Sequence, residues 1–251
     1  IIAQEYSFDW RLIISKLIFK AEQCGVSLLE NHRFLKGSLG KTSNLVFMNN
    51  NNLIDYELDI VVNATYSNIN GINTKLGVEL VPIEFELAEM VMIEVPKKYQ
   101  KIGITIMDGN FTSVMPFGHS GYHTISNVRR TPHERATKKY PVFKCNSLEN
   151  NTICDSQNLN VCLKCPFRPK TWAQEMLDFA EKYMPDIKDS KIIESMFAVK
   201  AILKKSDDTD KRPTVVFRSK KYLNYYSVLS GKVDSVIDMS QKMVDLINES
   251  A

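Results

Sequence analysis

The sequence contains no apolar run of the roughly 18 residues or more that a membrane-spanning helix needs. It also lacks a large excess of either charge: 32 basic against 29 acidic residues give a net charge of +3, and only eight of the basic residues are arginine. This balance argues against a dedicated nucleic-acid-binding protein. With 44% hydrophobic residues in 251, the chain is no disordered protein and can form one large domain or two small ones.

The start of the chain has neither an initiator methionine nor the basic and apolar blocks of a signal peptide. Cysteine is scarce, and its five residues are unevenly spaced. An odd number without a targeting segment is more typical of reduced thiols in a cytoplasmic protein than of a secreted disulfide framework. We therefore expect a cytoplasmic protein with a cropped N-terminus, or the product of a gene fragment.

Both ends of the chain have α/β character. Helices are expected over residues 7–24, with Ser7 as N-cap and Gly25 as stop, and from residue 233 onward. Strands are expected over 26–34, in a hairpin of 45–48 and 53–58 turned by an asparagine run, and over 59–65, 214–217 and 222–229.

The middle of the chain differs. Alternating apolar residues over 85–95, 102–106, 111–116 and 122–129 indicate an antiparallel meander, followed by a poorly periodic excursion over 135–169. A helix is expected over 171–184, whereas 195–203 fits a strand or a helix. We predict an α/β (α+β) fold in which one module, residues 1–75 and 206–251, is interrupted by an antiparallel-sheet module, residues 76–205.

Two segments have features of a ligand site. The apolar strand that ends in Asn63-Ala64-Thr65 offers small residues where α/β sheets bind nucleotides, although a buried strand running into a turn has the same pattern. The turn Ser230-Gly231-Lys232 precedes a helix, whose free N–H groups can hold an anionic group or can simply be capped.

The order of these elements resembles that of the D-amino-acid-oxidase-like family of FAD-dependent oxidoreductases. The resemblance covers nearly the whole chain and is most specific over Asp59–Thr65, Val114–Gly118 and Asp210–Asp234. It implies a discontinuous, Rossmann-like FAD-binding module with an inserted antiparallel sheet that binds the substrate. The cofactor it implies is FAD.

The sequence departs from this family in two places. It has no G-x-G-x-x-G turn after a first strand. Gly37 and Gly40 have the wrong spacing for this turn and do not stand between a strand and a helix. The chain therefore looks like the C-terminal part of a longer enzyme, with an incomplete FAD-binding module. Tyr66 also stands where many relatives have glycine.

The resemblance implies positions for the cofactor. Asn63, Ala64 and Thr65 would line it, and Phe34 would lie near the adenine. Backbone N–H groups near the flavin pyrimidine ring would come from Gly231, Lys232, Val233 and Asp234.

Four residues are candidates for contact with a small-molecule substrate. Arg212 falls where some relatives place a guanidinium for a substrate carboxylate, although it also fits a surface ion pair. His123 and Arg129 are expected to share a sheet face, with Pro116 on the neighbouring segment. A structural role for the histidine is the alternative.

The excursion carries Cys145, Cys154, Cys162 and Cys165 within twenty-one residues. A Cys-x-x-Cys pair with two further thiolates could form a structural zinc site, although no second close pair is present. Free thiols or adventitious disulfides are the alternatives.

The function expected from the resemblance is oxidation of a C–N or C–OH bond of a small polar substrate, such as an amino acid, amine or hydroxy acid. Hydride transfer to the flavin requires no protein base, so no catalytic residue is assigned and the electron acceptor stays open. The alternative function is a cofactor-free binding or scaffold domain.

Overall fold

The computed structural model describes residues 2, 7–107, 109, 111–204 and 213–249, which fall into two discontinuous units. Unit 1 comprises Ile1–Leu28, Leu87–His133 and Val161–Ala198, and unit 2 comprises Leu29–Glu86, Glu134–Asn160 and Val199–Ala251. These bounds differ from the sequence-based ones, because the first helix groups with the antiparallel sheet and residues 134–160 with the other unit. Within the described ranges, every helix is too short or too polar to span a membrane.

Unit 2 contains an antiparallel sheet of β1 (Arg33–Ser38), β2 (Ser43–Asn49) and β3 (Asn52–Leu58), in that order. Asn50 and Asn51 turn the β2–β3 hairpin with φ of 45° and 73°. Asparagine tolerates this left-handed conformation better than other residues with a side chain. The hairpin predicted from the asparagine run is therefore confirmed, whereas the first strand begins at Arg33 and not at residue 26.

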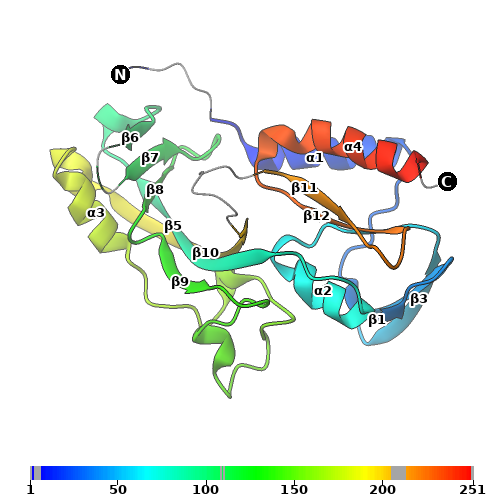
Figure 1. Cartoon of the computed structure of the whole chain (residues 1–251). Helices are drawn as coiled ribbons and strands as arrows, with labels where there is room; N and C mark the ends of the chain where they lie inside the picture. The colour runs from blue at the N-terminus through cyan, green and yellow to red at the C-terminus, as the bar shows by residue number, and fades with distance from the viewer. Residues whose placement is uncertain (1, 3–6, 108, 110, 205–212, 250–251) are drawn as a thin grey trace. The chain divides into compact units, whose positions relative to one another are not determined.

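A second sheet of unit 2 has the order β11-β12-β4. Figure 1 shows β11 and β12 of this sheet side by side. Its strands are β11 (Val215–Arg218), β12 (Tyr225–Leu229) and β4 (Val61–Asn63). β12 runs antiparallel to β11 but parallel to β4, with Tyr225 opposite Val61 and Ser227 opposite Asn63. The sheet thus joins segments from distant parts of the sequence.

Each of the two parallel strands is followed by helical structure. After β4 come η1 (Tyr66–Asn68) and α2 (Ile69–Leu76), and after β12 come η6 (Val233–Ser235) and α4 (Val236–Asn248). A buried cluster of Leu45, Val61, Leu76 and Tyr225 packs sheet residues and α2 together. This strand–helix alternation is the α/β part of the predicted fold.

Unit 1 begins with α1 (Trp10–Gln23), whose N-cap is Asp9 rather than the predicted Ser7. The Asp9 carboxylate accepts the Arg11 N–H, and Gly25 ends the helix region with a φ of 80°. No residue of α1 is buried, and Leu17 and Phe19 are 54% and 60% exposed. An apolar face of this kind is unusual for a helix in contact with water only.

The sheet of unit 1 contains β5 (Ile83–Glu94), β6 (Ile104–Ile106), β7 (Thr112–Pro116) and β8 (His123–Asn127), with η2 (Lys97–Tyr99) between β5 and β6. It is antiparallel, as predicted, but its order is β5-β8-β7-β6. Only β6, β7 and β8 form the predicted meander, because β5 pairs with β8 and not with β6. β10 (Lys191–Leu203) and β9 (Pro132–Ala136) pair with β5, and these three strands have residues in both units. Residues 195–203 are therefore strand, not helix.

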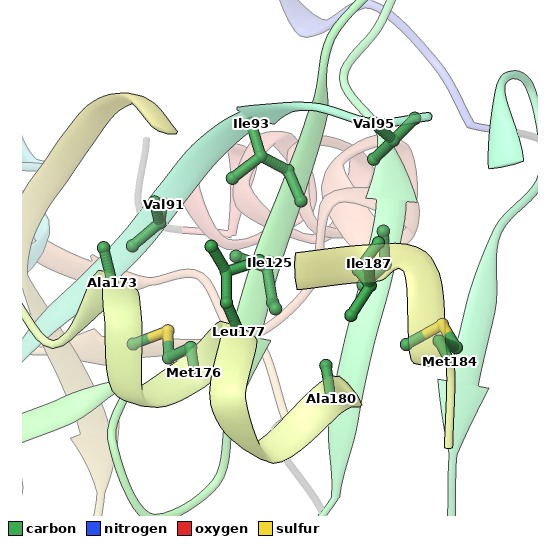
Figure 2. Packing of buried hydrophobic residues seen from close by; sticks show 11 residues of the cluster. Val91, Ile93, Val95, Ile125, Ala173, Met176, Leu177, Ala180, Met184 and Ile187 are labelled. Carbon is green, nitrogen blue, oxygen red and sulfur yellow. The ribbon is translucent and has the colours of Figure 1, made fainter. Parts of the chain in front are cut away.

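One face of this sheet is covered by α3 (Ala173–Glu181) and η5 (Pro185–Asp189). Figure 2 shows Val91, Ile93 and Ile125 of the strands facing Met176 and Leu177 of α3. The cluster excludes water from all five side chains, which are at most 2% exposed. Burial of this apolar area is the main stabilising contribution to unit 1.

A buried carboxylate lies at the start of α3. Glu89 of β5 is fully buried, and its Oε2 accepts the Trp172 N–H at 2.9 Å and pairs with His133 Nε2 at 2.8 Å. The Thr171 hydroxyl donates to Oε1 of the same carboxylate and also contacts Ser195 Oγ. Glu89 therefore connects β5 to the first turn of α3, whose N–H groups need acceptors.

The excursion between β9 and α3 has little regular structure. Its only regular elements in the described chain are η3 (Cys145–Ser147) and η4 (Cys162–Lys164). Among the described residues no group of three or more His, Cys, Asp or Glu side chains is placed to hold a metal ion. The four cysteines are therefore not grouped for a metal ion in the described structure, and the zinc site stays a prediction.

Candidate functional site

The carboxyl ends of β4 and β12 lie at the same edge of their sheet, because the two strands are parallel and paired at Asn63 and Ser227. The residues after β4 are Ala64 and Thr65, and those after β12 lead through Gly231 into η6. Ligands of open α/β sheets bind outside such carboxyl ends. The fold therefore brings together the two segments that the sequence analysis singled out.

The segment after β4 leaves its backbone accessible. Ala64, Thr65 and Tyr66 are all exposed. Tyr66 has a φ of 55°, in the left-handed region that glycine enters without strain. The turn thus keeps a glycine-like conformation although it carries a tyrosine.

Asn63 holds this turn from within. Its Nδ2 donates to Ile69 O at 3.1 Å, and its Oδ1 accepts the N–H and the hydroxyl of Thr65 at 3.2 and 2.7 Å. The side chain is only 4% exposed. The side chain of Asn63 therefore holds the turn through hydrogen bonds within the protein. Ala64 and Thr65 remain the surface that a ligand can approach.

A buried polar network connects this turn to β12. Asn73 Oδ1 accepts hydrogen bonds from Asn63 Nδ2 at 2.8 Å, Tyr225 Oη at 2.7 Å and Ser227 Oγ at 3.1 Å. Asn73 Nδ2 donates to Glu79 O at 2.8 Å. Because an unpaired buried polar group is costly, this network fixes the two strand ends relative to one another.

Sequence reasoning missed Asn73, Tyr225 and Ser227. A signal existed, because Asn73 follows Ile69 by four residues and precedes Leu76 by three, so it occupies the apolar face of α2. A polar residue in such a position usually has a buried partner.

Tyr225 makes the network sensitive to alkaline pH. Burial raises the pKa of its phenol to about 12, against the opposing effect of its hydrogen bonds with Asn63 and Ser227. A raised pKa means that the stabilisation is complete below the usual value of 10 and is lost as the pH rises toward 12. Two pKa units correspond to about 2–3 kcal/mol.

We expect tyrosinate absorbance to contain a late step from Tyr225, and the stability of unit 2 to fall over the same pH range. Tyr225→Phe should abolish the late step, whereas Tyr66→Phe, at the exposed turn, should leave it unchanged. A late step that persists in Tyr225→Phe would contradict the assignment.

The segment after β12 offers a helix start. η6 and α4 have no side-chain cap bond among the described residues, so N–H groups of their first turns have no side-chain acceptor there. The Gly231 N–H donates to Thr214 Oγ1 at 3.0 Å. Lys232 and Val233 are exposed, and the backbone of Asp234 lies in η6. The N–H groups predicted to face the cofactor therefore lie at the same edge as Ala64 and Thr65, and that of Gly231 already has a partner there.

The remaining predicted residues lie elsewhere. Phe34 is in β1, where its ring contacts Phe47 at 5.6 Å and Lys75 Nζ at 5.9 Å. Arg212 lies outside the described residues.

The expected pairing of His123 and Arg129 on one sheet face is not found. β8 ends at Asn127, and Arg129 follows in a turn in which its N–H donates to Asn127 Oδ1 at 2.9 Å. His123 instead lies opposite Ile93 and Pro116 in the register, on the side of the buried cluster. The structure thus brings together Pro116 and His123 but not Arg129.

Comparison with known proteins finds no matching family model and no curated protein of similar sequence. Solved structures do match. Glycine oxidase from Geobacillus kaustophilus is 13% identical, with a TM-score of 0.55 over 88% of this chain and 48% of that one. Glycerol-3-phosphate dehydrogenase from Bacillus halodurans, complexed with FAD, is 13% identical, with a TM-score of 0.61 over 94% and 42%.

Iminodiacetate oxidase from Chelativorans sp. BNC1 is similar at 12% identity and a TM-score of 0.53, over 87% of this chain and 48% of that one. The chain therefore spans less than half the length of these three structures. Identity this low is informative about architecture only. The resemblance inferred from the sequence is confirmed at that level: the chain has the fold of these oxidase and dehydrogenase structures.

Proposed function

We propose that the chain is part of an FAD-dependent oxidoreductase and that the carboxyl edge of β4 and β12 contributes to its cofactor site. The observation that carries this proposal is the parallel pairing of β4 with β12. It places the turn after Asn63 and the helix start after Gly231 at one edge. One of the structures that share the fold is a complex with FAD.

The residues at this edge fit such a group. Small, exposed Ala64 and Thr65 allow a ligand to reach the backbone, and the start of η6 offers N–H groups and a positive helix end to an anionic or carbonyl oxygen. Lys232 adds a positive charge beside them. Bound FAD would supply the acceptor for two electrons. The chain's own part is to hold and orient that group.

An open strand edge in unit 2 supports the view that a further segment completes the site. β4 is an edge strand of its sheet, so one side of its backbone has no strand partner in the described part of the chain. An uncovered strand edge promotes aggregation unless another element covers it. A segment with the G-x-G-x-x-G turn, which this sequence lacks, would be the expected addition.

For the reaction, we propose oxidation of a C–N or C–OH bond of a small polar substrate, with the substrate bound by the antiparallel sheet of unit 1. This proposal depends on the implied family and on the fold shared with an oxidase and a dehydrogenase. The electron acceptor is left open.

The proposal is tested by adding FAD to the chain and following backbone amide shifts by NMR, which detects weak binding. Because the sequence lacks a pyrophosphate-binding turn, we expect weak but saturable binding. The shifts should concentrate at Ala64, Thr65, Lys232 and Val233, and amides at the opposite end of the strands, such as Ile60 and Asn224, serve as an internal reference.

Ala64→Leu provides the sharper comparison, because Ala64 is exposed and its replacement should not disturb the core. We expect it to weaken FAD binding by about tenfold or more with no loss of stability, that is, by about 1.4 kcal/mol of binding free energy. Asp59→Leu places the same side chain at the opposite end of β4, where Asp59 is exposed, and should have no effect. Shifts confined to other surfaces, or none at millimolar FAD, would favour the cofactor-free scaffold.

A further inference from the structure

A cavity lies within unit 1, independent of the carboxyl edge of β4 and β12 described above. It has a volume of about 470 Å³ and lies between the tip of the β7–β8 hairpin and the loop that follows η2. Pro116 and His123 line it from the strands, Gly118 and His119 from the hairpin tip, and Lys101 from the loop. Its size suits one small organic molecule.

His123 is the unusual residue of this cavity. It is only 2% exposed, and neither of its ring nitrogens makes a hydrogen bond within the described structure. Burial lowers the pKa of its imidazole. The nearby backbone of Tyr99 and Ile102 favours the protonated ring, but it is not in hydrogen-bonding geometry and its effect is smaller than that of burial. Burying an imidazole without a hydrogen-bond partner costs free energy, so binding of a ligand that supplies such a partner would be favoured.

The hairpin tip that forms one wall is held in place. Asp9 Oδ2 accepts the His119 N–H at 3.2 Å, and the same carboxylate is bound by Arg11 Nη2 at 2.8 Å. Gly118 has a φ of 54°, and a Cβ there would lie 2.6 Å from the Asp9 carboxylate. The wall is therefore built by a specific close approach of backbone to side chain.

The charge of the cavity favours an anion. Lys101, His119 and Tyr122 are the charged or titratable groups that line it besides His123, and no described lining residue carries a carboxylate. The carboxylate of Asp9, which contacts the hairpin tip, is paired with Arg11, whose hydrogen bond lowers the pKa of Asp9 and whose charge offsets that of the carboxylate. Lys101 also has a φ of 62°, an uncommon conformation for a lysine, at the cavity rim.

We propose that this cavity binds a small monocarboxylate, with His123 as its hydrogen-bond donor and Lys101 as its counter-charge. One imidazole N–H and one ammonium group suffice for a single negative charge. A phosphate dianion would lose its hydration on entering the cavity, and these two donors are too few to replace the lost water. The proposal does not depend on flavin binding, because every residue involved belongs to unit 1.

The test uses the chain as it is and follows the imidazole C2–H signal of His123 by NMR. We expect acetate and glycolate to shift this signal saturably at millimolar concentration and to raise the pKa of His123, whereas chloride at equal ionic strength should not. His123→Phe should weaken binding, measured by calorimetry, by about tenfold or more. Lys101→Met should weaken it severalfold, and it tests the proposal should His123→Phe fail to fold.

His32→Phe is the matched control. His32 lies in unit 2, where it contacts Asn49 and Tyr56, so its loss should leave carboxylate binding unchanged. The proposal is overturned if no carboxylate moves the His123 signal, or if Lys101→Met and His32→Phe have equal effects. Tighter binding of phosphate than of acetate would overturn the monocarboxylate assignment.

Discussion

Glu89→Ala is expected to destabilise unit 1 by about 3–5 kcal/mol, because it removes the acceptor of a buried hydrogen-bond cluster. The Trp172 N–H and the Thr171 hydroxyl would lose their acceptor, and His133, whose ring lies 5.1 Å from that of Phe197, would lose its carboxylate partner. The measurement is denaturant unfolding combined with site-resolved hydrogen exchange. Loss of protection should be greatest in the first turn of α3.

Glu94→Ala is the matched control. Glu94 belongs to the same strand but is exposed, so its replacement should change the stability by no more than about 0.5 kcal/mol. Equal effects of the two substitutions would show that the hydrogen bonds to Glu89 contribute little.

The hydrogen bonds of Glu89 also indicate that the stability of unit 1 depends on pH in the acidic range. Burial opposes ionisation of Glu89, but hydrogen bonds from Thr171, Trp172 and His133 outweigh it and lower the pKa of the carboxyl. A lowered pKa means that the stabilisation is complete above the usual value of 4.5 and is lost as the pH falls through the folded value. Unit 1 of the wild type should therefore lose stability below about pH 4.5 more steeply than that of Glu89→Gln.

The second large effect is expected for Asn73→Leu, which keeps a similar volume but removes the centre of the network at the candidate cofactor edge. Three donors, from Asn63, Tyr225 and Ser227, would lose a common acceptor in a buried setting. We expect a loss of about 3–5 kcal/mol from unit 2. Amide protection of β4 and β12 should fall together, because the network connects them.

Thr74→Ala provides the comparison on the same helix. Its hydroxyl is exposed and bonds to Asn70 O, so its removal should cost less than about 1 kcal/mol. If Asn73→Leu lowered protection only within α2, the network would not be what holds the two strands in register.

Local signals in the sequence were sufficient for several elements. The asparagine run predicted the β2–β3 hairpin because Asn50 and Asn51 adopt left-handed angles that few other residues tolerate. The prediction that the first strand begins at residue 26 was wrong, because the strand begins at Arg33. Val26 and Leu29 are apolar, but they are about half exposed and pair with no strand. An apolar pattern describes a strand only when a partner is available.

For the candidate site, sequence reasoning found both strand ends but not what connects them. The pairing of His123 with Arg129 was wrong because Asn127 ends β8: its backbone and side chain accept hydrogen bonds from Thr131 and Arg129 and form a turn. The contacts of Asn73 with β12 depend on residues far away in the sequence. Periodicity within one segment does not report such contacts.

The pairing of β4 with β12 has a consequence for how the chain acquires its structure. Asn63 and Tyr225 are 162 residues apart, so on the ribosome β4 emerges long before the strand that it pairs with. The hairpin of β7 and β8 in unit 1, by contrast, can form between neighbouring segments. Since distant pairing requires a large loop to close, the β4–β12 sheet is expected to form late and slowly. Until then the apolar strand Val61–Asn63 is unprotected, and a nascent chain halted before Tyr225 would be a natural substrate for chaperones.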